Sequence, residues 1–186
     1  MDNMTSTNTV HSEFLRFSRH KLLGEYWPRL RSSVESLSDE QVWWRPNEAC
    51  NSIGNLILHL NGNVRQWLVS SFRRVEDARN RPAEFSERRC VPATTLLAKL
   101  ETTLNEAGEV LASLTEADLL MTFHIQGYTV SGVQAVYQVV EHFALHYGQI
   151  LYVTKLLRGE DLGFYRKLDK TGRLPAEHPQ RGDEQQ

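Results

Sequence analysis

The chain has 186 residues, of which 40% are hydrophobic and 24% are charged, and its formal net charge is -2. This length is typical of one domain, and the composition is ordinary for a globular protein. Because so small a net charge creates no field that would gather polyanions, nucleic acids and anionic membranes are not expected partners.

The sequence carries no recognisable export or membrane signal, so we expect a cytoplasmic protein. The first residues, MDNMTSTNTVHSEF, lack the basic start and the apolar core of a secretory signal. No apolar run approaches the roughly 20 residues of a membrane helix. Cys50 and Cys90 match no zinc or redox spacing, and we interpret them as small buried or loop residues without a disulfide.

Helical periodicity dominates the sequence and predicts two long helices in its first half. The first covers about residues 9–37, and Pro28 should kink or split it, because proline removes a donor and crowds the preceding turn. The second begins near Ser52 and ends in the arginine-rich stretch before Pro82. Its apolar stripe has regular helical spacing and comprises Ile53, Leu56, Ile57, Leu60, Val64, Trp67 and Leu68.

Two further long helices are predicted in the second half. The third starts just after Pro92, with leucines or alanine at helical spacing up to Leu114. The fourth takes Ser131 as its N-cap and stops at Gly159, a residue suited to the left-handed position beyond a helix end. Between them MTFHIQGYTV alternates apolar and polar residues around Gly127, which predicts a short hairpin.

The predicted fold is all-α: a four-helix bundle over residues 1–166, with a short hairpin between the third and fourth helices. Four amphipathic helices bury their stripes best against one another, and a bundle is the layer arrangement open to an all-α chain of this size. Residues 167–186 are rich in proline, glycine and charge, and we expect a loosely held polar tail.

Three histidines lie on the edges of two apolar stripes. His142 and His146 are four residues apart, so both imidazoles stand on one side of the fourth helix. His59 lies in the second helix beside Leu56 and Asn63. Bundle cores hold metals where facing helices point ligands inward, and three imidazoles leave a fourth position for water or substrate. From spacing alone, histidines with a purely structural role remain the alternative.

Two segments resemble the DinB/YfiT-like superfamily. NSIGNLILHLNGNVRQWL (residues 51–68) is followed by VVEHFALHYGQI (residues 139–150), and LSDEQVWWRPNEACNSIGNL resembles the entry to the second helix in a subgroup of unknown function. The resemblance covers about residues 10–160. Members are four-helix bundles with one metal-binding histidine on the second helix and an H-x3-H pair on the fourth.

The resemblance implies that His59, His142 and His146 bind a divalent metal ion, with zinc or nickel as leading candidates because imidazole suits both. Relatives include low-molecular-weight-thiol transferases, thiol-dependent isomerases and candidate metal-dependent hydrolases, and fold analogy does not select among them. Both hydrolysis and thiol transfer use a cation that acidifies a bound nucleophile. A small-molecule substrate is expected, with a thiol cosubstrate in the second case.

Several other residues are candidates for supporting roles. Four amides lie about one turn from the histidines and either bind their second nitrogens or are plain exposed amides: Asn55, Asn63, Gln138 and Gln149. Glu141 points away from His142 and is interpreted as a solvated or interhelical charge. Arg45 either binds an acidic group of the substrate or stacks on Trp44, and stacking is the preferred interpretation. The remaining histidines, His11, His20, His124 and His178, are expected to have no role in the site.

The sequence also allows two rival functions. The superfamily name suggests nucleic-acid binding, supported only by SSFRRVEDARNRPAEFSERR, whose six arginines are largely offset by Glu76, Asp77, Glu84 and Glu87; a solvated helix end and loop is the preferred interpretation. The second rival is a non-enzymatic metal-binding or dimerisation bundle. A homodimer is one assembly that the sequence allows, through exposed aromatics such as Trp43, Trp44 and Trp67 if they are not in the core.

Overall fold

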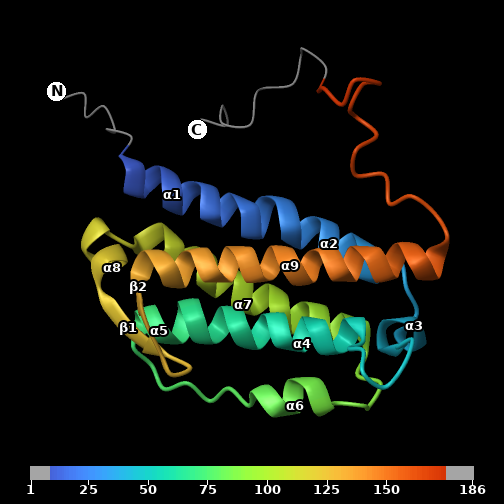
Figure 1. Cartoon of the computed structure of the whole chain (residues 1–186), viewed down its shortest axis with the longest axis horizontal. Helices are drawn as coiled ribbons and strands as arrows, with labels where there is room; N and C mark the ends of the chain where they lie inside the picture. Colours follow the sequence, from blue (N-terminus) through green and yellow to red (C-terminus); the bar gives the residue numbers. More distant parts are fainter. Residues whose placement is uncertain (1–8, 175–186) are drawn as a thin grey trace.

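The structure of the protein, a computed structural model, describes residues 9–174 and is mostly helical, with one small two-stranded sheet. Four long helical segments lie lengthwise beside one another (Figure 1), and each packs against neighbouring segments. Within the described range, none of the helices has the length and apolar character needed to cross a bilayer. Of the predicted tail, residues 175–186 and with them His178 lie outside the described residues.

The first helical segment combines α1 (Val10–Arg19), the π-helical η1 (His20–Tyr26) and α2 (Trp27–Glu35). Pro28 was expected to kink or split this helix, but no loop interrupts it. The backbone N–H of Trp27 bonds to the carbonyl of Leu22, five residues back, so the chain is already in a widened turn when Pro28 arrives at the start of α2. A proline is tolerated in a first helical turn because its missing donor is not needed there.

The second helical segment combines α4 (Ile53–Val64), the π-helical η2 (Arg65–Ser70) and α5 (Ser71–Arg73). Ser52 caps it as predicted, in a reciprocal capping box with Asn55. It ends at Arg74, whose φ of 54° is left-handed. The short α3 (Asp39–Trp43) precedes it.

A short helix that the sequence did not predict follows the second segment. α6 (Arg81–Ser86) lies along the outer side of α4 (Figure 1) and belongs to an outer segment, residues 74–89, that was expected to be a solvated helix end and loop. Asn55 Nδ2 anchors this segment by donating to the carbonyls of Glu84 and Glu87 at 3.0 and 3.1 Å. The expectation of a solvated stretch was therefore wrong for its central part.

The second half of the chain follows the prediction closely. α7 (Ala93–Ser113) begins directly after Pro92, and α8 (Glu116–Leu120) leads into β1 (Thr122–Ile125) and β2 (Tyr128–Ser131). These strands pair antiparallel, with Gln126 and Gly127 both at positive φ in the turn. α9 (Gly132–Arg158) is capped by Ser131 and ends at Gly159 with φ 70°.

The stripes of the four helical segments meet in one apolar core. Its largest fully buried side chains come from all four: Phe143, Leu22, Leu30, Ile53, Ile57, Leu60, Leu68, Leu100, Leu104, Leu111, Ile150 and Val34. Cys50 and Cys90 are free, in agreement with the sequence analysis. α4 and α9 are neighbours in this packing and run in opposite directions (Figure 1), which brings the middle of one beside the middle of the other.

Candidate metal centre

The three predicted histidines come together where α4 faces α9. His59 Nε2 lies 3.0 Å from His142 Nε2, which lies 3.2 Å from His146 Nε2. One ligand atom from each residue lies within 4.8 Å of the others. His59 is 4% exposed and the other two are half-buried, so the cluster sits at the edge of the core. These three side chains could hold a metal ion.

The second ring nitrogen of His59 is held by a buried ion pair. His59 Nδ1 lies 2.8 Å from Glu84 Oε2, and Arg79 donates to both oxygens of Glu84, from Nε at 2.7 Å and from Nη2 at 2.9 Å. Arg79 Nη2 also lies 3.2 Å from His59 Nδ1. Since the carboxylate only accepts and makes the shorter contact, the Nδ1 proton belongs between His59 and Glu84, which leaves the Nε2 lone pair facing the cluster.

Glu84 is ionised in this position. Burial acts to raise the pKa of its carboxyl, but the hydrogen bonds from Arg79 and His59, with their charges, outweigh it and hold that pKa below its ordinary value. Gly62 makes room for the pair on the surface of α4: a Cβ there would collide with Glu84 Oε1 and lie 2.8 Å from Arg79 Nε. The absence of a side chain at position 62 thus lets the Arg79–Glu84 pair lie directly against α4.

The two histidines of α9 are supported differently. His146 Nδ1 lies 2.7 Å from Gln149 Oε1, whereas His142 Nδ1 is buried and has no hydrogen-bond partner among the described residues. Burial, followed by the neighbouring His146 and His59, lowers the pKa of His142 to about 3. Burial also lowers the pKa of His146. Both imidazoles are therefore neutral at pH 7, which is the form that binds a metal.

A cavity of about 400 Å³ opens beside His59 and His142. Its wall continues along α4 and η2 to Asn63 and Trp67 and along α9 to Gln138, and the hairpin contributes Tyr128. The triad therefore has protein on one side and a space that admits a small molecule on the other. An open position of this kind distinguishes catalytic from structural metal sites.

The family described as proteins of unknown function, DUF1572, matches residues 9–166. The chain belongs to the DUF1572 family. This family is part of the DinB/YfiT-like group, as the sequence analysis predicted.

Solved structures show the same fold. A conserved protein from Enterococcus faecalis superposes with a TM-score of 0.66 at 14% identity, over 78% of this chain and 97% of that one. A DinB-like protein from Bacillus cereus ATCC 10987 superposes with a TM-score of 0.61 at 15% identity, over 80% of this chain and 93% of that one. No curated protein matches the sequence. At these identities the similarity concerns the fold alone.

Sequence reasoning missed Arg79 and Glu84, the two residues of this DUF1572 protein that support His59. A signal was available in NRPAEF: Asn80 accepts from the backbone N–H of Ala83 as an N-cap, and Pro82 occupies the first turn of α6. The amphipathic turn that follows places Glu84 inward, 8% exposed. Phe85, from the same turn, packs its ring 4.6 Å from the His59 ring.

The other expected supporting residues had mixed outcomes. Gln149 binds His146 as proposed, and Asn63 and Gln138 line the cavity, but Asn55 anchors the outer segment and does not reach a histidine. Glu141 is exposed, as expected. Arg45 was predicted to stack on Trp44, but its Nη2 lies 3.3 Å from Glu48 Oε2, where an opposite charge is available.

The histidines expected to lie outside the site do so, within the described part of the chain. His124 Nδ1 lies 3.0 Å from Thr129 Oγ1 across the hairpin, and the ring of His20 stacks on that of Phe17. His11 lies near Thr9 and Glu116 at the start of α1.

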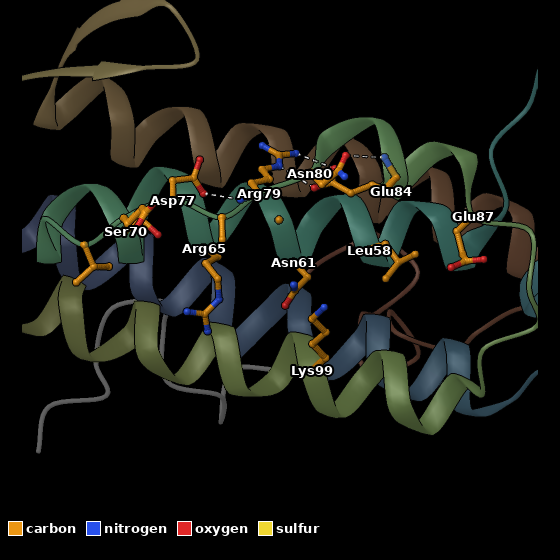
Figure 2. Close-up of a pocket in the computed structure, with 15 residues that line it drawn as sticks. Leu58, Asn61, Arg65, Ser70, Asp77, Arg79, Asn80, Glu84, Glu87 and Lys99 are labelled. Carbon is orange, nitrogen blue, oxygen red and sulfur yellow. Dashed lines mark hydrogen bonds and ion pairs between the residues drawn. The ribbon is translucent and has the colours of Figure 1, made fainter.

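A second cavity lies on the opposite side of the Arg79–Glu84 pair. Figure 2 shows it between the outer segment, α4 and α7, with Arg65 and Lys99 on its lower side. Its volume is about 490 Å³, and four carboxylates and three cations line it. No histidine is among its lining residues. The pair thus separates a cavity lined by His59 and His142 from one whose lining has no histidine.

Proposed function

We propose that this protein is a metal-dependent enzyme whose centre is a divalent ion, zinc or nickel, held by His59, His142 and His146. The observation that carries the proposal is the convergence of three imidazoles, each presenting Nε2, at the edge of a cavity. The donor set fits the ion, since neutral imidazole nitrogens suit both metals. A carboxylate bound to the second nitrogen of one ligand is also typical of metal sites.

A divalent ion bound there would acidify a bound water or thiol toward neutral pH and polarise a substrate oxygen. The protein's own residues orient the ligands and shape the approach. Glu84 and Arg79 hold the His59 ring, Gln149 holds that of His146, and the core behind them excludes water from one side of the centre.

Hydrolysis and transfer of a low-molecular-weight thiol remain the two candidate reactions, and the substrate is a small molecule in both. Neither Cys50 nor Cys90 lines the cavity, so in the second reaction the thiol comes from a cosubstrate. The alternative is a non-enzymatic bundle that binds metal for stability or serves as a dimerisation module.

Metal content tests the proposal directly. Protein purified without a His-tag is analysed for zinc and nickel beside His59→Ala, His142→Ala and His146→Ala, with His124→Ala in the hairpin as the matched control. We expect about one metal ion per chain in the wild type and in the control, and a large loss in the three triad variants. Equal metal content in all five proteins would refute the site.

The number of protein ligands separates the enzyme from the alternative. Substitution with cobalt, followed by absorption spectroscopy with and without added azide, reports whether an external ligand enters the coordination sphere. An azide-dependent change is expected for three protein ligands with an open position. An unchanged spectrum would favour a closed, structural site.

The remaining predictions concern architecture and assembly. We class the four helical segments as a DinB-like four-helix bundle over residues 1–166, followed by a polar tail. The homodimer stays a prediction. Of the aromatic residues considered for its interface, Trp67 is 3% exposed and Trp43 packs against the core, whereas Trp44 is 37% exposed. Further exposed apolar side chains lie on α9, at Tyr137, Leu145, Tyr152 and Leu156. Nucleic acid is not a proposed partner, since arginines of the outer region such as Arg73, Arg79 and Arg89 are paired with carboxylates.

A further inference from the structure

Unpartnered polar atoms are concentrated at the cavity beside His59. Among the described residues, five buried side-chain nitrogen or oxygen atoms have no hydrogen-bond partner. Four of them, Asn63 Oδ1, Trp67 Nε1, Gln138 Oε1 and His142 Nδ1, belong to residues that line this one cavity. Leaving a buried polar atom unpaired costs about 1–3 kcal/mol, so their clustering marks a place where a polar partner binds.

These atoms form an extension of the triad along both helices. His59, Asn63 and Trp67 follow one another at intervals of four residues, and so do Gln138, His142 and His146. α4 and α9 run in opposite directions, so the C-terminal part of α4 lies beside the N-terminal part of α9. Asn63 and Trp67, which follow His59, therefore lie toward the same end of the molecule as Gln138 and Gln134, which precede His142. Residues four apart lie on one side of a helix, so both rows line the same groove.

The chemistry of the rows specifies what they recognise. Asn63 and Trp67 are each 3% exposed, so neither can turn to bulk water. The unpartnered set contains two amide oxygens, which need donors, and one indole N–H, which needs an acceptor. One amide group supplies both, because it carries an N–H and a carbonyl oxygen side by side.

The cavity also favours a negative charge. Arg79 and Arg81 line it, and no aspartate or glutamate does. Arg79 is bound to Glu84, but Arg81 is exposed and its guanidinium lies over the Phe85 ring, 5.0 Å from the centroid. None of the ion pairs among the described residues involves Arg81. A guanidinium binds a carboxylate through two parallel hydrogen bonds.

We propose that this cavity is the substrate site and binds small carboxylated amides of the N-acyl amino acid class. The carboxylate pairs with Arg81, and the amide bonds to Asn63, Trp67 and Gln138 beside the three histidines. A cavity of about 400 Å³ is in the range of small-molecule sites. That the bound amide is a substrate rests on the proposed function, whereas binding of the amide in this cavity does not.

Three probes of nearly equal shape test the assignment by NMR titration. N-acetylglycine has both groups, N-acetylglycinamide lacks the charge, and 4-oxopentanoate replaces the amide N–H by a methylene. We expect N-acetylglycine to bind at least about tenfold more tightly than either analogue, with shifts in the resonances of Trp67 and Gln138. Equal affinities for the three probes, or shifts elsewhere only, would overturn the proposal.

Substitutions in the cavity test separately the residues that bind the carboxylate and those that bind the amide of the ligand. Arg81→Gln should abolish the preference over N-acetylglycinamide. Gln138→Leu removes an acceptor for the amide N–H and should reduce N-acetylglycine to the affinity of 4-oxopentanoate. Trp67→Phe removes a donor to the carbonyl oxygen, which both probes carry, and should weaken the two to the same degree. Arg89→Gln, in the same outer segment but outside this cavity, is the matched control and should change nothing. Arg81 is exposed, so its variant remains informative even if Trp67→Phe impairs folding.

The titrations are run with zinc added and after treatment with EDTA, and zinc content is measured in parallel. Discrimination among the probes without zinc binding would sustain the ligand site and refute the metal enzyme. Zinc binding without discrimination among the probes would refute the ligand site and leave the metal site standing. If the probe's carboxylate coordinated the ion directly, the affinity of N-acetylglycine would depend on zinc and would be unchanged in Arg81→Gln.

Discussion

The two cavities on either side of the Arg79–Glu84 pair are similar in size and opposite in character. The cavity of Figure 2, of about 490 Å³, mixes four carboxylates with three cations, and none of the buried unpartnered atoms lies on it. The cavity of about 400 Å³ has no carboxylate on its lining, four unpartnered atoms and two of the three histidines. Volume therefore does not identify the site; unsatisfied polar groups and converging ligands do.

The largest effect is expected from breaking the pair that separates the cavities. Arg79→Met leaves Glu84 as an uncompensated carboxylate, 8% exposed, beside His59. Losing one partner of a buried ion pair lowers the free energy of unfolding by about 3–5 kcal/mol. Urea denaturation measures the loss.

Arg89→Met is the matched control, because Arg89 pairs with Glu87 in the same segment while its own side chain is 85% exposed. An exposed pair contributes little. If both variants lost equal stability, the Arg79–Glu84 pair would have no special role.

The next effect separates two carboxylates that both line the cavity of Figure 2, of which only Glu84 binds His59. Glu84→Gln keeps an acceptor for His59 but removes the charge, and zinc affinity should fall about 10–100-fold, as is usual when the partner of a ligating histidine is changed. Glu87→Gln makes the same substitution in the same lining, at a carboxylate that pairs with Arg89 and not with a histidine, and should leave zinc affinity unchanged. Competition with a chromophoric chelator measures both, and a similar loss in each would contradict the assignment.

A smaller effect on zinc affinity is expected from the contact between Gln149 and His146. Gln149 is exposed, so water can replace its contact with His146 Nδ1. Gln149→Ala should therefore weaken zinc binding by no more than about tenfold. The exposed neighbour variant Glu141→Ala provides the baseline in the same chelator assay. A loss exceeding that of Glu84→Gln would reverse the order proposed for the two supports.

The smallest effect concerns acid pH in the cavity of Figure 2. Hydrogen bonds from Arg89 lower the pKa of Glu87 from 4.5 to about 2. Because the folded-state pKa is depressed, the stabilisation is complete above pH 4.5 and is lost as the pH falls toward 2. NMR titration should show Glu87 still ionised at pH 3, and Arg89→Met should return its pKa toward 4.5. An unchanged pKa in that variant would assign the shift to other groups.

The long helices and the triad could be predicted because their signals are local. Apolar residues at helical spacing predicted the four helical segments. Ser52 and Ser131 predicted the starts of two helices, and Gly159 predicted the end of one. His142 and His146 share a helix face by spacing alone. The placement of His59 opposite them came from the family resemblance, since which helices are neighbours is not a local property.

The support of His59 could not be predicted because its signal is ambiguous. In sequence, Arg79 and Glu84 belong to a stretch of mixed charge that is typical of a solvated surface. Only the contact with α4, across 25 residues for Glu84 and His59, turns them into a buried pair. The π-helical turns could not be predicted either, because they depend on how a helix is packed and not on its composition.

Gly62 makes position 62 a marker for related sequences. A relative with glycine there, together with an arginine and a glutamate spaced as Arg79 and Glu84 are, can place a carboxylate against the histidine that corresponds to His59. In a relative with a larger residue that carboxylate would have to shift from the position it takes here, because even one added carbon would collide with Glu84 Oε1. Sorting DUF1572 sequences by this one residue should therefore separate proteins with two different ways of orienting the same ligand.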